Sequence, residues 1–195
     1  MPIESLEIIG KWKQLCRLLI SYNDFKHAAD IAHYYLEGDY ELDREEWADG
    51  DYYQRRVMGE AMNCAMIIAY ARPFSGNDKA ALEKIPDLPS RYVRSLDERG
   101  RQVHELIIKD RNSRMAHSDS DAWEMIPQVL ELGEGRELIA PVHNDTLAPL
   151  SKDDIRILMS NCNIFMESIM EAREDLERQL QGYLPELKVL DEGDE

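Results

Sequence analysis

The stretch that decides the fold is residues 153–176, DDIRILMSNCNIFMESIMEAREDL. Its apolar residues recur in alternating steps of three and four, which is the period of one face of an α-helix. They are Ile155, Leu158, Cys162, Phe165, Ile169, Ala172 and Leu176. The pair Asp153-Asp154 favours a helix start, because carboxylates stabilise the positive end of the helix dipole. We expect a long packing helix here, and its regular stripe would also suit a dimer seam.

Upstream of this helix, the same period predicts further helices. One covers residues 3–19, and Ser21–Asp24 are residue types that end one helix and cap the next. A second then runs over residues 24–36. A third carries apolar residues from position 47 and ends before Pro73, which cannot continue a helix.

A fourth helix is expected from between residues 90 and 95 to about residue 115. Its start signal is a capping box, in which Ser95 caps free amides and Glu98, three positions on, reaches back. Gly100 weakens this helix by about 1 kcal/mol without forbidding it.

Between residues 123 and 150 the period changes. Two apolar segments flank Gly133-Glu134-Gly135, which predicts a β-hairpin with a glycine turn. Pro127 and Pro141 confine both strands to sheet edges, because proline has no N–H to donate. The expected fold is therefore mainly α, an antiparallel helical bundle with a small β-hairpin appendage.

Domain organisation follows from these elements and the length. The 195 residues fit a single helical domain over 1–184, with the hairpin as an insertion at about 122–144. Residues 185–195 read as an acidic, flexible tail.

Composition excludes several functional classes. The chain has 23 basic and 39 acidic residues, a net charge of −16, which argues against a generic polyanion binder. No segment approaches the run of about 18 apolar residues that a membrane helix needs, so no membrane partner is expected.

The three cysteines, Cys16, Cys64 and Cys162, are far apart and outside any zinc-type spacing. We expect no metal, no disulfide and a cytoplasmic location.

The basic residues are concentrated in the fourth predicted helix. Residues 91–114 hold seven basic and four acidic residues, a net of +3, so the rest of the chain carries −19. One interpretation is a solvated helix face with ion pairs one turn apart. The other is a localised site for an anion.

This helix ends in residues 111–119, RNSRMAHSD, in which Arg111-Asn112 precede His117. The string resembles the R-x(4–6)-H motif of the HEPN superfamily of helical nucleotide-binding and ribonuclease domains. Its form, with Arg72-Pro73-Phe74 after an upstream helix, looks most like a bacterial branch associated with phage abortive infection. The resemblance covers about residues 24–180, but its specific part is shorter than twenty residues. It implies a HEPN-like bundle.

The resemblance also implies a function. HEPN nucleases cleave RNA without a metal or cofactor, at a composite site where two protomers face their motifs in a dimer cleft. Carried over, His117 would activate the ribose 2′-hydroxyl or protonate the leaving oxygen, and Arg111 would stabilise charge on the phosphorane. Asn112 would position the backbone or Arg111. The implied partners are single-stranded RNA or tRNA, or a nucleotide, a second copy of the chain, and an antitoxin protein in a toxin system. No DNA partner is implied.

Helix geometry agrees with only part of what the resemblance implies. On an ideal α-helix Arg111 and His117 lie about 120° apart, so the helix must end or kink between them for the two to meet. A helix C-terminus would raise the pKa of His117. We name three further candidate substrate-binding residues, Arg72, His104 and Arg114. The alternatives are a salt bridge for Arg72 and a half-buried structural role for His104.

Two other functions stay open. The chain could be a non-catalytic HEPN module that binds nucleotide or RNA. It could instead be a helical interaction protein whose acidic surface binds a basic partner. Asp119 stands where some HEPN toxins carry a tyrosine that an antitoxin modifies, so regulation of that type is not supported.

Overall fold

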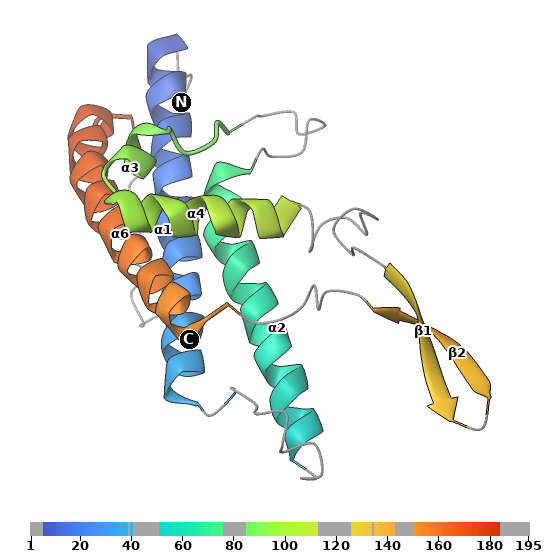
Figure 1. Ribbon diagram of the computed structural model, residues 1–195. Helices are drawn as coiled ribbons and strands as arrows, with labels where there is room; N and C mark the ends of the chain where they lie inside the picture. The colour runs from blue at the N-terminus through green and yellow to red at the C-terminus, as the bar shows by residue number, and fades with distance from the viewer. Residues whose placement is uncertain are drawn as a thin grey trace, which may run out of the picture.

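The computed structural model describes residues 6–38, 40, 51–75, 85–112, 126–133, 135–142 and 150–183. This part of the chain is mainly α-helical (Figure 1). Its elements are α1 (Leu6–Glu37), α2 (Tyr52–Ala71), the 3-10 helix η2 (Arg72–Phe74), α3 (Arg91–Arg94), α4 (Glu98–Asp110), β1 (Ile126–Gly133), β2 (Arg136–Val142) and α6 (Lys152–Leu180). No helix in these ranges combines the length and apolar character needed to span a membrane. The tail predicted for residues 185–195 lies outside them.

The long helix α1 forms the centre of the bundle. Both α2 and α6 pack against it and run in the opposite direction, while α4 crosses them (Figure 1). The aromatic centre of this core joins α1 to α6 through Phe25 and Phe165, whose ring centroids are 4.8 Å apart. The core therefore lies between antiparallel helices.

α1 is one continuous helix of 32 residues, so the predicted break at Ser21–Asp24 is wrong. Ser21 and Phe25 are both fully buried in the middle of the helix. Breaking α1 there would remove Phe25 from the core. Tertiary packing thus outweighs the weak preference of Ser, Asn and Asp for helix ends.

The apolar stripe of α6 is buried inside its own chain. Ile155, Leu158, Cys162, Phe165 and Ile169 have no exposed surface. Ser151 caps the helix by accepting a hydrogen bond from the Asp154 N–H at 3.1 Å. The predicted packing helix is confirmed, but its stripe is occupied within the chain and is not available as a dimer seam.

The fourth predicted helix is divided into α3 and α4. The N-cap of α4 is Asp97, whose side chain accepts from the Gly100 N–H. The Ser95 hydroxyl instead donates to the Tyr92 carbonyl at 2.6 Å, so the predicted capping box does not form. The α-helical part of α4 ends at Asp110, earlier than the predicted residue 115.

The strands β1 and β2 pair antiparallel as a hairpin that projects from the helices (Figure 1). Gly133 and Gly135 have positive φ angles of 82° and 72°, which glycine adopts without strain. Pro127 and Pro141 face each other in the register. In a two-stranded ribbon both strands are edges, so neither proline interrupts a larger ladder.

Candidate functional site

The helix that ends in the motif, α4, is fixed to α6 at its first turn. The Asn161 amide donates to the Gly100 carbonyl at 2.9 Å. A Cβ at Gly100 would lie 2.6 Å from Asn161 Oδ1, a distance that side-chain atoms do not tolerate. Glycine therefore permits the two helices to approach at this point, which gives a reason for a residue that weakens the helix locally.

A buried hydrogen-bond chain then joins α6, α2 and α4. The Asn161 amide donates to the Tyr70 hydroxyl at 3.3 Å, and that hydroxyl lies 3.2 Å from His104 Nδ1. Burial raises the pKa of Tyr70, so its hydroxyl keeps its proton. Burial also lowers the pKa of His104, which favours the neutral form of the ring that shares this hydrogen bond with Tyr70.

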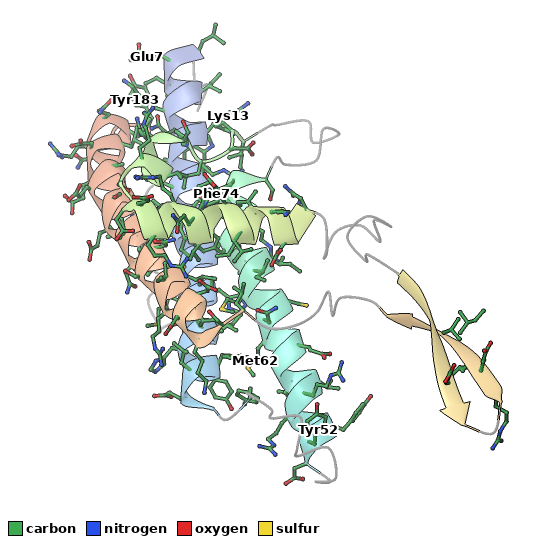
Figure 2. The ribbon with its side chains drawn as sticks, in the orientation of Figure 1. Glu7, Lys13, Tyr52, Met62, Phe74 and Tyr183 are labelled. Atoms are coloured by element: carbon green, nitrogen blue, oxygen red, sulfur yellow. The ribbon has the colours of Figure 1, made fainter. Side chains whose placement is uncertain are left out.

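The His104 ring also contacts one of the two sequence strings on which the HEPN resemblance depends. The ring centroid of Phe74, the last residue of η2, lies 4.7 Å from that of His104 in an edge-to-face arrangement. Figure 2 labels Phe74 beside α4. Arg72-Pro73-Phe74 and α4 are thus neighbours in the fold. His104 is only 8% exposed. Its observed partners are structural, and its contribution to substrate binding stays a prediction.

Arg111 and Asn112 form the end of the basic helix. The chain leaves α-helical geometry here, and both residues lie in a π-helical turn. The Arg111 guanidinium donates to Asn112 Oδ1 at 2.9 Å. The amide therefore restrains the arginine, and the role of Asn112 in a catalytic site stays a prediction.

The charge of Arg111 is not neutralised by a carboxylate within the described ranges. Other arginines of the basic segment are engaged: Arg99 pairs with Asp154 at 2.6 Å, and Arg101 donates to the Leu96 carbonyl. The neighbouring Asp110 is buried at 6% exposure, whereas Asn112 is exposed. A guanidinium held by a neutral amide keeps its full charge and several free donors, which suits an anion such as phosphate.

Arg72 has a carboxylate partner. Its guanidinium lies 3.5 Å from Asp24 Oδ1, and its side chain is 59% exposed. Burial raises the pKa of Asp24, and the opposing effect of Arg72 is smaller. The salt-bridge alternative for Arg72 is thus observed. An exposed pair of this length is weak and leaves donors for a second anion.

The remaining candidates, Arg114 and His117, lie outside the described residues. Within the described ranges no group of three or more His, Cys, Asp or Glu side chains is placed to hold a metal ion. Tyr70 and Asn161 were not predicted from the sequence. Position 161 lies on the buried side of α6 between Leu158 and Phe165. A polar residue on an apolar stripe was the sequence signal that could have identified it, because buried polar groups have hydrogen-bond partners.

Comparisons of the chain with models of protein families, with curated proteins and with solved structures found no match. Any assignment of function therefore rests on the motif strings and on the local geometry described above.

Proposed function

We propose that this protein is a HEPN-type, metal-independent endoribonuclease of a phage-defence or toxin system. The observation that carries the proposal is Arg111, held by Asn112 at the end of the basic helix and without a carboxylate partner in the described ranges. The contact between Phe74 and His104 supports it, because it joins Arg72-Pro73-Phe74 to the helix that leads into the Arg111 string. In this proposal the antiparallel arrangement of α1, α2 and α6 is a HEPN-like bundle.

Arg111 is the electrostatic group of the proposed site. A guanidinium donates two parallel hydrogen bonds to a phosphate and stabilises the extra negative charge of the phosphorane. Asn112 restricts the rotamers of Arg111, so less conformational entropy is lost when substrate binds.

His117 is the proposed acid or base. As base it removes the proton of the ribose 2′-hydroxyl while the 2′-oxygen attacks phosphorus. The bond to the 5′-oxygen breaks and an acid protonates that oxygen, so the products are a 2′,3′-cyclic phosphate and a 5′-hydroxyl. Because the motif supplies one histidine per chain, two facing chains would supply both acid and base.

Charge distribution supports a selective site. The segment 91–114 carries +3 on a chain of −16. Long RNA would be repelled by most of the surface, while one exposed phosphate is attracted to the end of α4. We therefore expect a weak dependence of cleavage on salt, corresponding to few phosphate contacts.

The test is RNA cleavage by the full chain in the presence of EDTA. Wild-type protein should cut tRNA or single-stranded RNA and leave 2′,3′-cyclic phosphate ends. Arg111→Ala and His117→Ala should abolish the activity with the helical circular dichroism intact. Arg94→Ala is the matched control: Arg94 is exposed in the same basic segment, so its loss removes one charge but should preserve cleavage.

Each other outcome has a defined meaning. Equal cleavage by all four proteins would point to a contaminating nuclease and remove the proposal. Nucleotide or RNA binding without cleavage, lost only in Arg111→Ala, would identify the non-catalytic HEPN module. No binding and no cleavage would leave the helical interaction protein, with a structural role for the motif.

A further inference from the structure

The outward side of α2 carries a row of exposed residues along its whole length. Within the described ranges α2 packs on α1 and α4, and no described helix or strand covers its remaining side (Figure 1). Tyr53, Arg56 and Val57 are exposed near the start of α2, and the other exposed positions alternate in steps of four and three. We call them the outer row: Gln54, Met58, Ala61, Ala65, Ile68 and Arg72. Met58 is 45% exposed and Ile68 36%, so two large apolar side chains face outward.

The outer row contains no acidic residue, although the chain carries −16. The charged residues of α2 are Arg55, Arg56 and Glu60, and they lie off this row. Arg56 and Glu60 neutralise each other at 2.7 Å. Two copies of a strongly acidic protein repel each other at most contacts, and the outer row is a surface where that repulsion is small.

The positions of the outer row are symmetric about Asn63, and the two alanines are the pair with identical residues. Met58 and Ile68 are equidistant from it, as are Ala61 and Ala65, and Gln54 and Arg72. When two identical helices pack antiparallel about a two-fold axis, each residue faces its mirror position on the other copy. Met58 would then meet Ile68, the two alanines would allow close approach at the centre, and the Gln54 carbonyl would accept from Arg72.

We propose that α2 pairs antiparallel with α2 of a second copy of this chain, about a two-fold axis at the level of Asn63. Steps of four and three are the spacing of a left-handed helix pair with interlocking side chains. A row that is complementary to itself specifies a second copy of the chain better than it specifies an unrelated partner.

The pairing has a consequence for the candidate site. Figure 1 shows α4 crossing α2 and ending beyond it, on the side of the bundle that α2 forms. Arg111 is the C-cap of α4. A second copy on this side brings a second motif toward the first. This consequence rests on the proposed function, whereas the pairing itself does not.

The first experiment measures mass by sedimentation velocity over a concentration series. Wild-type protein should be a dimer, and Met58→Glu should be a monomer because it places an unpaired charge in an apolar contact. Met170→Glu is the matched control, since Met170 is 37% exposed on α6 and lies off the proposed interface. It should remain dimeric. A monomeric wild type, or a dimer insensitive to Met58→Glu, overturns the proposal.

The second experiment tests the antiparallel register. The double variant Met58→Glu/Ile68→Lys places the introduced carboxylate of one copy opposite the introduced ammonium group of the other, at both ends of the row, and the dimer should return. Met58→Glu/Ile68→Glu should stay monomeric. These positions are ten residues apart, so they cannot pair within one helix. If both double variants behave alike, the proposed register is wrong.

The two proposals fail separately. A dimer with this mutational pattern and no RNA cleavage would remove the nuclease function and retain the pairing. Cleavage that is undiminished in monomeric Met58→Glu would remove the composite site, and cleavage by a monomeric wild type would also remove the α2 pairing.

Discussion

Two helix faces in this protein have the same spacing and different environments. The stripe of α6 and the outer row of α2 both step by three and four residues, and both contain large apolar side chains. Ile169 on α6 is fully buried, whereas Ile68 on α2 is 36% exposed. The difference shows that helical periodicity identifies a face that packs, while the identity of its partner depends on the rest of the fold.

The reason for the difference is geometric. α6 lies along α1 and uses its single apolar face there. α2 also packs on α1, through a separate face that includes Met66, Ile67 and Tyr70. α2 therefore has two apolar faces: one packs on α1, and the second is the outer row. Exposed apolar area of this kind marks an interaction site more often than an isolated exposed residue does.

The largest effect we expect comes from the α6 face. Ile169→Ala should lower the free energy of unfolding by about 2–5 kcal/mol, because it leaves a cavity in the core. Urea denaturation measures this, with Met170→Ala as the neighbouring control that should cost within about 0.5 kcal/mol. Equal costs for the two variants would mean that the α6 stripe does not form the core.

Much of the fold could be predicted because long amphipathic segments are governed by a period that local sequence displays. The start of α6 is one example, since Asp153 and Asp154, expected to stabilise the helix dipole, lie in its first turn. The failures occurred where a local signal competes with packing. Ser21–Asp24 carries helix-ending residues, yet buried Phe25 holds α1 continuous.

The candidate site was predictable only in part. The strings around Arg72 and Arg111 could be located, but the contact of Phe74 in the first string with His104, seven residues before the second, joins residues 30 positions apart and depends on tertiary structure. The role of Asn112 in orienting Arg111 also required coordinates.

A smaller effect on the free energy of unfolding should come from His104, which lies where α4 meets the covered side of α2. Its pKa is lowered by burial, so below pH 6.5, the ordinary histidine value, the unfolded chain binds a proton that the folded chain resists. The contribution of His104 to the free energy of unfolding is therefore complete above pH 6.5 and is lost as the pH falls below it. The difference in unfolding free energy between wild type and His104→Gln should therefore shrink toward acid pH in urea titrations. A difference that is constant with pH would contradict the buried neutral ring. The effect of Asp24, whose raised pKa acts in the opposite direction, is common to both proteins and cancels.

The smallest effect should come from Ile68→Ala on the outer row, and it should depend on protein concentration. In a dilute, monomeric sample the side chain is partly solvated, so its truncation should cost within about 0.5 kcal/mol. In a concentrated sample the wild type gains stability from dimerisation and the variant gains less, so the two melting temperatures should separate. Ile169→Ala offers the same chemical change with a cost that does not vary with concentration. If Ile68→Ala were as costly as Ile169→Ala in dilute solution, the outer row would belong to the core of the monomer, and the distinction between the two faces would disappear.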